Sequence, residues 1–167
     1  MTEDLDALNE YLQSQAEKML PPWNELPDIE LYMDQLTGLV NRYLGNNTKD
    51  RMLTPAMVNN YVKMKVMPAP VKKKYGRVHL VYLLLICILK QIMPLSSVEA
   101  VLRSGLEQAE PERFYENVRR LYAASFQEAA GIAETMIGQG EMLHKMTLAL
   151  ALKAHAEQAL AQGLLEL

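Results

Sequence analysis

Four cationic side chains stand within seven residues in the segment VKKKYGR, residues 71–77, and they are the groups of this chain whose chemistry is easiest to interpret. Lysine and arginine bind phosphate oxygens through charge and hydrogen bonds. The window around them, residues 51–98, contains eight basic residues and no Asp or Glu, although the whole chain has a formal charge of −3. A surface that only needs solubility mixes both signs, whereas a surface that meets phosphates excludes carboxylates because each of them repels the ligand. The window therefore predicts nucleic-acid binding. Its basic residues are Arg51, Lys63, Lys65, Lys72, Lys73, Lys74, Arg77 and Lys90.

The groups that could carry out catalysis are few and scattered. His144 and His155 stand eleven residues apart, which is about 16 Å along a helix, so they cannot share one metal ion. The single cysteine, Cys87, lies in the apolar stretch LLLICILK and is expected to be a buried packing residue rather than a nucleophile. The sequence has no glycine-rich phosphate loop, zinc-ligand spacing or nucleophile motif. We therefore expect no enzyme activity, no metal and no cofactor.

The elements that must position the basic residues are expected to be helices, which makes the fold mainly α. Thr54 followed by Pro55 is a typical helix start, and Asp28 and Ser96 or Ser97 are further candidate N-caps. The segment 78–93 is apolar nearly all round and predicts a central buried helix. The proline-rich segment before it, residues 68–77, predicts an exposed loop or short hairpin. The expected helices span residues 1–19, 29–44, 55–66, 78–93, 98–106, 111–138 and 141–167.

The predicted helix 55–66 has one polar, basic stripe, which makes it a candidate for the second helix of a helix-turn-helix. Asparagine can form two hydrogen bonds to adenine, and lysine can reach guanine or phosphate. Two alternatives stay open here: Tyr61 is either a phosphate contact or a core residue, and His79 is either a phosphate contact or a helix-start residue. The candidate DNA-binding residues are Thr54, Ala56, Asn59, Asn60, Tyr61, Lys63, Lys72, Lys73, Lys74, Tyr75, Arg77 and His79.

The stretches TPAMVNNYVKMKVMP, KKYGRVHL and LKQIMPLSSVEAVL resemble the winged helix-turn-helix of MerR-type regulators. In that family a recognition helix with a central tyrosine leads into a basic wing, and two more helices follow. The whole chain is still more similar to a bacterial family without an assigned function, in which the pattern LT…NNYVK…P…KKYGR.H recurs. Ala56, Asn59 and Asn60 stand where MerR-type recognition helices usually carry arginines. The resemblance covers roughly residues 26–105.

The resemblance implies a transcriptional regulator that binds double-stranded DNA as a homodimer, with a basic wing at residues 71–77. It also implies a possible effector, although nothing in the sequence identifies one. The expected organisation is an N-terminal helix and connector (1–25), a MerR-like domain (26–105) and a C-terminal antiparallel helical hairpin for dimerisation (106–167). The alternative is a protein-interaction or adaptor module on the same fold, which the arginine-poor recognition helix favours. With no membrane span and no signal peptide expected, we place the protein in the cytoplasm.

Overall fold

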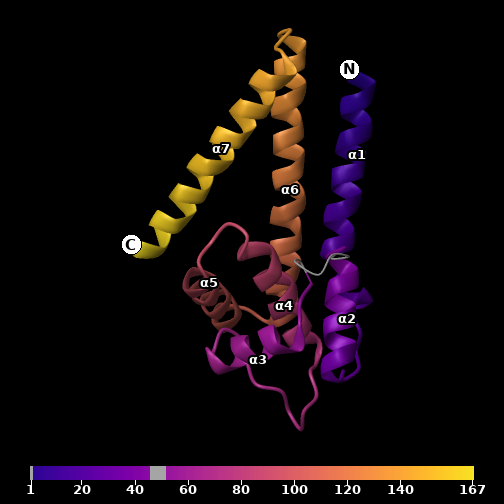
Figure 1. Ribbon diagram of the computed structural model, residues 1–167, viewed down its shortest axis with the longest axis vertical. Coiled ribbons are helices and arrows are strands. Elements are labelled where there is room, and N and C mark those ends of the chain that lie inside the picture. Colours follow the sequence, from indigo (N-terminus) through magenta and orange to yellow (C-terminus); the bar gives the residue numbers. More distant parts are fainter. Residues whose placement is uncertain (1, 46–51) are drawn as a thin grey trace. The chain divides into compact units, whose positions relative to one another are not determined.

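The computed structural model describes residues 2–45 and 52–167 and is mainly α-helical, as expected from the sequence (Figure 1). The helices are α1 (Thr2–Met19), η1 (Trp23–Glu25), α2 (Met33–Tyr43), α3 (Pro55–Lys63), α4 (Arg77–Leu89), α5 (Leu95–Gln108), α6 (Pro111–Gly138), α7 (Leu143–Gly163) and η2 (Leu164–Glu166). Within the described ranges the extended pairing is limited to two isolated β-bridges, Leu31 with Tyr75 and Val71 with Lys74.

The chain divides into two compact units, one spanning Lys18–Asn117 and the other combining Met1–Glu17 with Val118–Leu167. We call them the central unit and the long-helix unit. The sequence places thirteen basic and ten acidic residues in the central unit, but four basic and ten acidic residues in the long-helix unit. The expected MerR-like segment, residues 26–105, lies within the central unit. The positive charge is therefore concentrated in the unit that carries every candidate DNA-binding residue.

Helix α4 forms the core of the central unit, which confirms the prediction of a central buried helix. It contacts α2 and α5, and α2 in turn contacts α3. Its buried residues are Leu80, Val81, Leu83, Leu84, Leu85, Ile86 and Cys87. The Cys87 side chain is buried as expected, and burial raises the pKa of its thiol to about 11.

Two helix starts differ from the sequence-based prediction. Helix α2 begins at Met33 and not after Asp28, because the backbone of Leu31 is engaged in pairing with Tyr75. Helix α5 begins at Leu95 directly after Pro94, and no serine side chain caps it, so the predicted Ser96 or Ser97 cap is wrong. In both places the pairing or turn of the flanking backbone decides where the helix begins.

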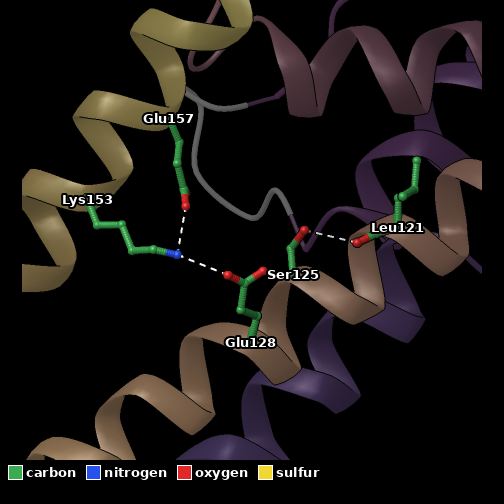
Figure 2. A network of polar contacts seen from close by, with 5 residues as sticks. All are labelled: Leu121, Ser125, Glu128, Lys153 and Glu157. Carbon is green, nitrogen blue, oxygen red and sulfur yellow. Dashed lines mark hydrogen bonds and ion pairs between the residues drawn. The ribbon is translucent and has the colours of Figure 1, made fainter.

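In the long-helix unit, α7 turns back after the end of α6 (Figure 1), and Gly140 makes this turn with a φ of +74°. Glycine suits this left-handed conformation because it has no Cβ to clash. The Lys153 ammonium lies 3.1 Å from Glu128 Oε1 of α6 and 2.8 Å from Glu157 Oε1 of α7 (Figure 2). Hydrogen bonds to Glu157 and Glu128 raise the pKa of Lys153. This polar contact joins the two helices on their exposed sides.

Candidate nucleic-acid interface

The outer face of α3 is exposed to solvent and carries the polar stripe expected from the sequence. Its exposed residues are Ala56, Asn59, Asn60 and Lys63. Thr54 is the N-cap, and its Oγ1 accepts a hydrogen bond from the Met57 backbone N–H at 3.3 Å. The Asn60 side-chain amide donates to the Met64 sulfur at 3.3 Å, a weak bond that leaves its carbonyl oxygen available. The face therefore presents amide donors and acceptors together with an ammonium group.

The opposite face of α3 packs into the core. Val58 is fully buried and Tyr61 is 5% exposed. The Tyr61 hydroxyl accepts a hydrogen bond from Lys90 Nζ at 3.2 Å, and the same ammonium lies 5.9 Å from the centre of the Tyr61 ring. Of the two interpretations of Tyr61, the structure places it in the core. Its contact with Lys90 also engages one of the eight basic residues of the window.

A buried asparagine holds the start of α3 against α2. The Asn41 side chain donates from Nδ2 to the Leu53 carbonyl at 2.9 Å and accepts from the Leu53 N–H at 2.7 Å. Asn41 is 8% exposed and Leu53 is 3% exposed, so both bonds are shielded from water. A buried backbone amide needs such partners. This pair therefore fixes the chain immediately before the Thr54 cap, despite the long connection between the two helices.

Helix α3 ends at Lys63, about one turn before the expected end at residue 66. The Val66 N–H donates to the Tyr61 carbonyl, and the Lys65 N–H donates to the Val62 carbonyl. Lys65 has a φ of +60°. This pattern is a Schellman ending, in which glycine usually occupies the left-handed position. Lys65 is thereby exposed beside the outer face of α3.

The expected wing is a minimal hairpin whose tip is formed by two lysines. The Val71 N–H donates to the Lys74 carbonyl at 3.1 Å, and the Lys74 N–H donates to the Val71 carbonyl at 2.9 Å. Lys72 and Lys73 have φ angles of +49° and +65°, as the two central residues of a type I′ turn do. Both side chains are exposed, and in the described ranges neither forms an ion pair or a hydrogen bond. We call Lys72 and Lys73 the hairpin tip.

The base of the hairpin is fixed by a buried tyrosine. The Leu31 N–H donates to the Tyr75 carbonyl at 2.8 Å, and the Tyr75 N–H donates to the Leu31 carbonyl at 2.9 Å. The Tyr75 side chain is 3% exposed, and burial raises its pKa. Tyr75 was expected at the DNA surface, but here it anchors the hairpin in the core.

The other two cations of the segment 71–77 are paired with acidic residues. Lys74 Nζ lies 3.5 Å from Glu30 Oε2 and 5.7 Å from the centre of the Tyr32 ring. Arg77 Nη2 lies 3.4 Å from Asp28 Oδ1. Although residues 51–98 contain no acidic residue, two acidic side chains from elsewhere in the chain lie close to this segment, because residues 28–31 run beside the hairpin base. Half of the positive charge in the segment is locally compensated.

Arg77 has a structural role in addition to its ion pair. Its guanidinium donates to the Leu26 carbonyl at 3.0 Å and to the Pro27 carbonyl at 3.4 Å, and lies 5.0 Å from the Trp23 ring. Such planar stacking and forked donation suit arginine better than lysine. Arg77 therefore ties the connector before α2 to the first turn of α4.

His79 is also held by backbone groups, which matches its interpretation as a helix-start residue. Its Nδ1 accepts a hydrogen bond from the Gly76 N–H at 3.1 Å, and its Nε2 lies 3.1 Å from the Ala69 carbonyl. These contacts fit the tautomer with the hydrogen on Nε2, which then donates to Ala69. His79 thus closes the segment between α3 and α4 at both ends.

The structure therefore separates the twelve candidate residues into a surface set and an internal set. The exposed members are Thr54, Ala56, Asn59, Asn60, Lys63, Lys72 and Lys73. The members engaged in internal contacts are Tyr61, Lys74, Tyr75, Arg77 and His79. Arg51, another cation of the window, lies outside the described residues.

Sequence reasoning missed Asn41, although a polar residue next to Val40 on a buried stripe signals a buried hydrogen bond.

No three His, Cys, Asp or Glu side chains among the described residues are grouped as metal ligands. None of their helices has the length and apolar character needed to cross a membrane.

Fold and surface together define a mainly α-helical protein whose central unit exposes a polar helix face and a lysine-tipped hairpin. A family model described as "Domain of unknown function (DUF1836)" matches residues 21–125, and the chain belongs to this family. The matched region includes every candidate residue of the interface. No curated protein and no solved structure matches the chain significantly.

Proposed function

We propose that the protein binds double-stranded DNA and regulates transcription, using the outer face of α3 for base contacts and the hairpin tip for phosphate contacts. The observation that carries the proposal is the set of uncompensated polar groups on one unit. Asn59, Asn60 and Lys63 are exposed on α3, and Lys72 and Lys73 are exposed without partners on the hairpin. At DNA interfaces, side-chain amides commonly form hydrogen bonds to base edges, and ammonium groups commonly bind phosphates.

The order of elements also supports the proposal. A short extended segment at Leu31 precedes α2 and α3, then the hairpin, α4 and α5 follow. This order is the one expected of a winged helix-turn-helix. The loop between α3 and α4 projects at the end of the central unit where α3 lies (Figure 1). In this protein the wing would be reduced to a two-residue turn held by the Leu31–Tyr75 bridge.

A protein-interaction role is the second candidate, and a specific observation favours it. Ile29, Tyr32 and Val71 are 66%, 57% and 61% exposed, and all three belong to the segments joined at the hairpin base. Exposed apolar residues of this kind mark protein-binding surfaces more often than DNA-binding ones. In this candidate the hairpin base, rather than α3, would make the main contact.

The DNA-binding proposal includes a homodimer formed through α7. Leu148, Leu152 and Leu160 are 59%, 59% and 65% exposed, whereas Met146 of the same helix is buried. A helix with so many exposed leucines gains stability when a partner covers it. A dimer would present two copies of α3 to two half-sites.

The experiment that tests the function is the recovery of bound genomic fragments with the full-length protein, followed by titration of the recovered sequence. Asn60→Ala should reduce the preference for the recovered sequence over random DNA by about tenfold, because one amide contact to a base is lost. Gln139→Ala removes an exposed amide far along the chain and should leave the preference unchanged. Failure to recover any enriched fragment, with binding to random DNA also absent, would eliminate the proposal.

A further inference from the structure

The long-helix unit contains an apolar pocket of about 210 Å³ among α1, α6 and α7. Its apolar wall includes Leu5, Leu8 and Leu12 from α1, three alanines and Phe126 from α6, and Leu143, Met146 and Leu150 from α7. The pocket exists because α6 contributes alanines where it faces the leucines of the other helices, so the side chains do not fill the space. A dry cavity of roughly 150 Å³ admits benzene. This pocket therefore has room for a ring or a short alkyl chain.

A polar groove of about 490 Å³ adjoins this pocket. The two share Asn9, Gln13 and Ala130 in their walls. The groove contains three carboxylates, Asp6 and Glu10 from α1 and Glu134 from α6. None of the three forms an ion pair in the described part of the chain. Like charges that line one groove repel each other, and a bound cation offsets that repulsion.

The two lysines of this unit form ion pairs outside the groove. Lys153 is held between Glu128 and Glu157 (Figure 2), and Lys145 lies 3.3 Å from Glu141 Oε2. No basic residue lines either the pocket or the groove. With ten acidic and four basic residues, the whole unit favours a cationic over an anionic ligand.

We infer that the long-helix unit binds a small amphipathic cation, whose apolar part enters the pocket and whose charged amine lies in the carboxylate groove. Asn9 and Gln13 stand where the two regions meet, so their amides can accept hydrogen bonds from the ammonium group. The apolar contact supplies affinity and the three carboxylates select the charge of the head group. This inference does not depend on DNA binding.

The test compares three probes that share an eight-carbon tail: octylammonium, octanol and octanoate. Each probe is titrated by calorimetry into the full-length protein, at probe concentrations below those at which the probe itself aggregates. We expect octylammonium to bind one molecule per chain, with a Kd about tenfold lower than that of octanoate, which corresponds to a modest electrostatic term. Octanol should fall between them. Equal affinities for the three probes, or tightest binding of octanoate, would overturn the assignment of the groove.

Two sets of variants separate the pocket from the groove. Ala133→Leu fills the pocket and should abolish binding of all three probes, and Ala129→Leu serves the same purpose if the first variant does not fold. Ala124→Leu, on an exposed part of the same helix, is the control and should bind normally. Glu10→Gln with Glu134→Gln, which leaves Asp6 as the single carboxylate of the groove, should clearly reduce the preference for octylammonium over octanol while octanol still binds. Glu110→Gln with Glu112→Gln removes the same charge outside the groove and should keep the preference.

Unchanged octylammonium binding in the folded pocket-filling variants would overturn the inference, because the ligand would then lie elsewhere. An undiminished preference for octylammonium in Glu10→Gln with Glu134→Gln would overturn the role of the carboxylates.

Discussion

Lys72 and Lys73 occupy backbone conformations that residues with side chains seldom adopt. A left-handed conformation costs a residue with a Cβ about 1–2 kcal/mol, and a two-residue hairpin of this turn type normally carries Asn-Gly. The chain has lysines at both positions, so local stability does not explain them. The two lysines are explained by the proposed DNA binding, in which the end of the hairpin brings two unpaired ammonium groups to an anionic partner.

Replacing the tip by the residues that the turn prefers should stabilise the protein. We expect Lys72→Asn with Lys73→Gly to raise the free energy of unfolding by about 1 kcal/mol, measured by urea titration. Lys72→Ala with Lys73→Ala removes the same charges but keeps a Cβ at each left-handed position, so it should give no gain. Equal stabilities for the two double variants would show that the turn is not strained.

The buried thiol of Cys87 makes stability depend on alkaline pH. Burial raises its pKa from 9.0 to about 11, with Lys90 acting in the opposite direction. The unfolded thiol therefore loses its proton first as the pH rises. The stabilisation is complete below pH 9 and is lost as the pH rises toward 11, by about 2–3 kcal/mol.

Urea unfolding across this pH range should therefore show a steeper loss of stability in the parent than in Cys87→Ala. The comparison cancels the contributions of the tyrosines, which both proteins share. Parallel pH profiles would contradict the burial of this thiol.

At the scale of the elements, the sequence predicted the long-range features that depend on periodicity. The apolar segment 78–93 is the buried helix α4, and residues 111–138 are α6 at the expected bounds. The start of α2 and the end of α3 could not be predicted, because backbone pairing with Tyr75 and a Schellman ending decide them. Such pairings join residues far apart in sequence or depend on φ angles that residue type does not specify.

The candidate site was predictable to a similar extent. The exposed stripe of α3 follows from helical periodicity, and the structure places Asn59, Asn60 and Lys63 on it. The partners of Lys74 and Arg77 did not follow, because Glu30 and Asp28 come from another part of the chain. The free charge of the hairpin is therefore smaller than its sequence suggests.

The position of α3 relative to α2 depends on the buried pair between Asn41 and Leu53. We expect Asn41→Ala to lower the free energy of unfolding by about 2–3 kcal/mol, because it leaves a buried N–H and carbonyl without partners. Asn59→Ala is the matched control on the exposed face and should change stability by less than about 0.5 kcal/mol. A cost for Asn41→Ala as small as that of the control would mean that water replaces the side chain.

At the scale of the whole molecule, the two units differ in charge and in the surface they expose. The central unit has an excess of basic residues, and the long-helix unit has an excess of acidic residues and a helix rich in exposed leucine. This segregation suits a protein that binds DNA with one unit and associates through the other.

The proposed dimer should dissociate when charge is placed on the exposed face of α7. We expect Leu148→Glu with Leu152→Glu to give a monomer in sedimentation equilibrium at concentrations where the parent is dimeric, with unchanged helical content by circular dichroism. Ala124→Glu, an exposed position on α6, should leave the parent's mass unchanged. A monomeric parent would exclude this interface, and a double variant that stays dimeric would place the contact elsewhere.

The most direct test of DNA binding by α3 and the hairpin tip is the dependence of DNA affinity on salt. In fluorescence anisotropy titrations, Lys72→Gln with Lys73→Gln should reduce the slope of log K against log salt by about 1.8, because two phosphate contacts are lost. Lys18→Gln with Lys145→Gln removes two lysines from outside the proposed surface and should keep the parent's slope. A parent without salt-dependent binding, or a tip variant with the parent's slope, would contradict the account.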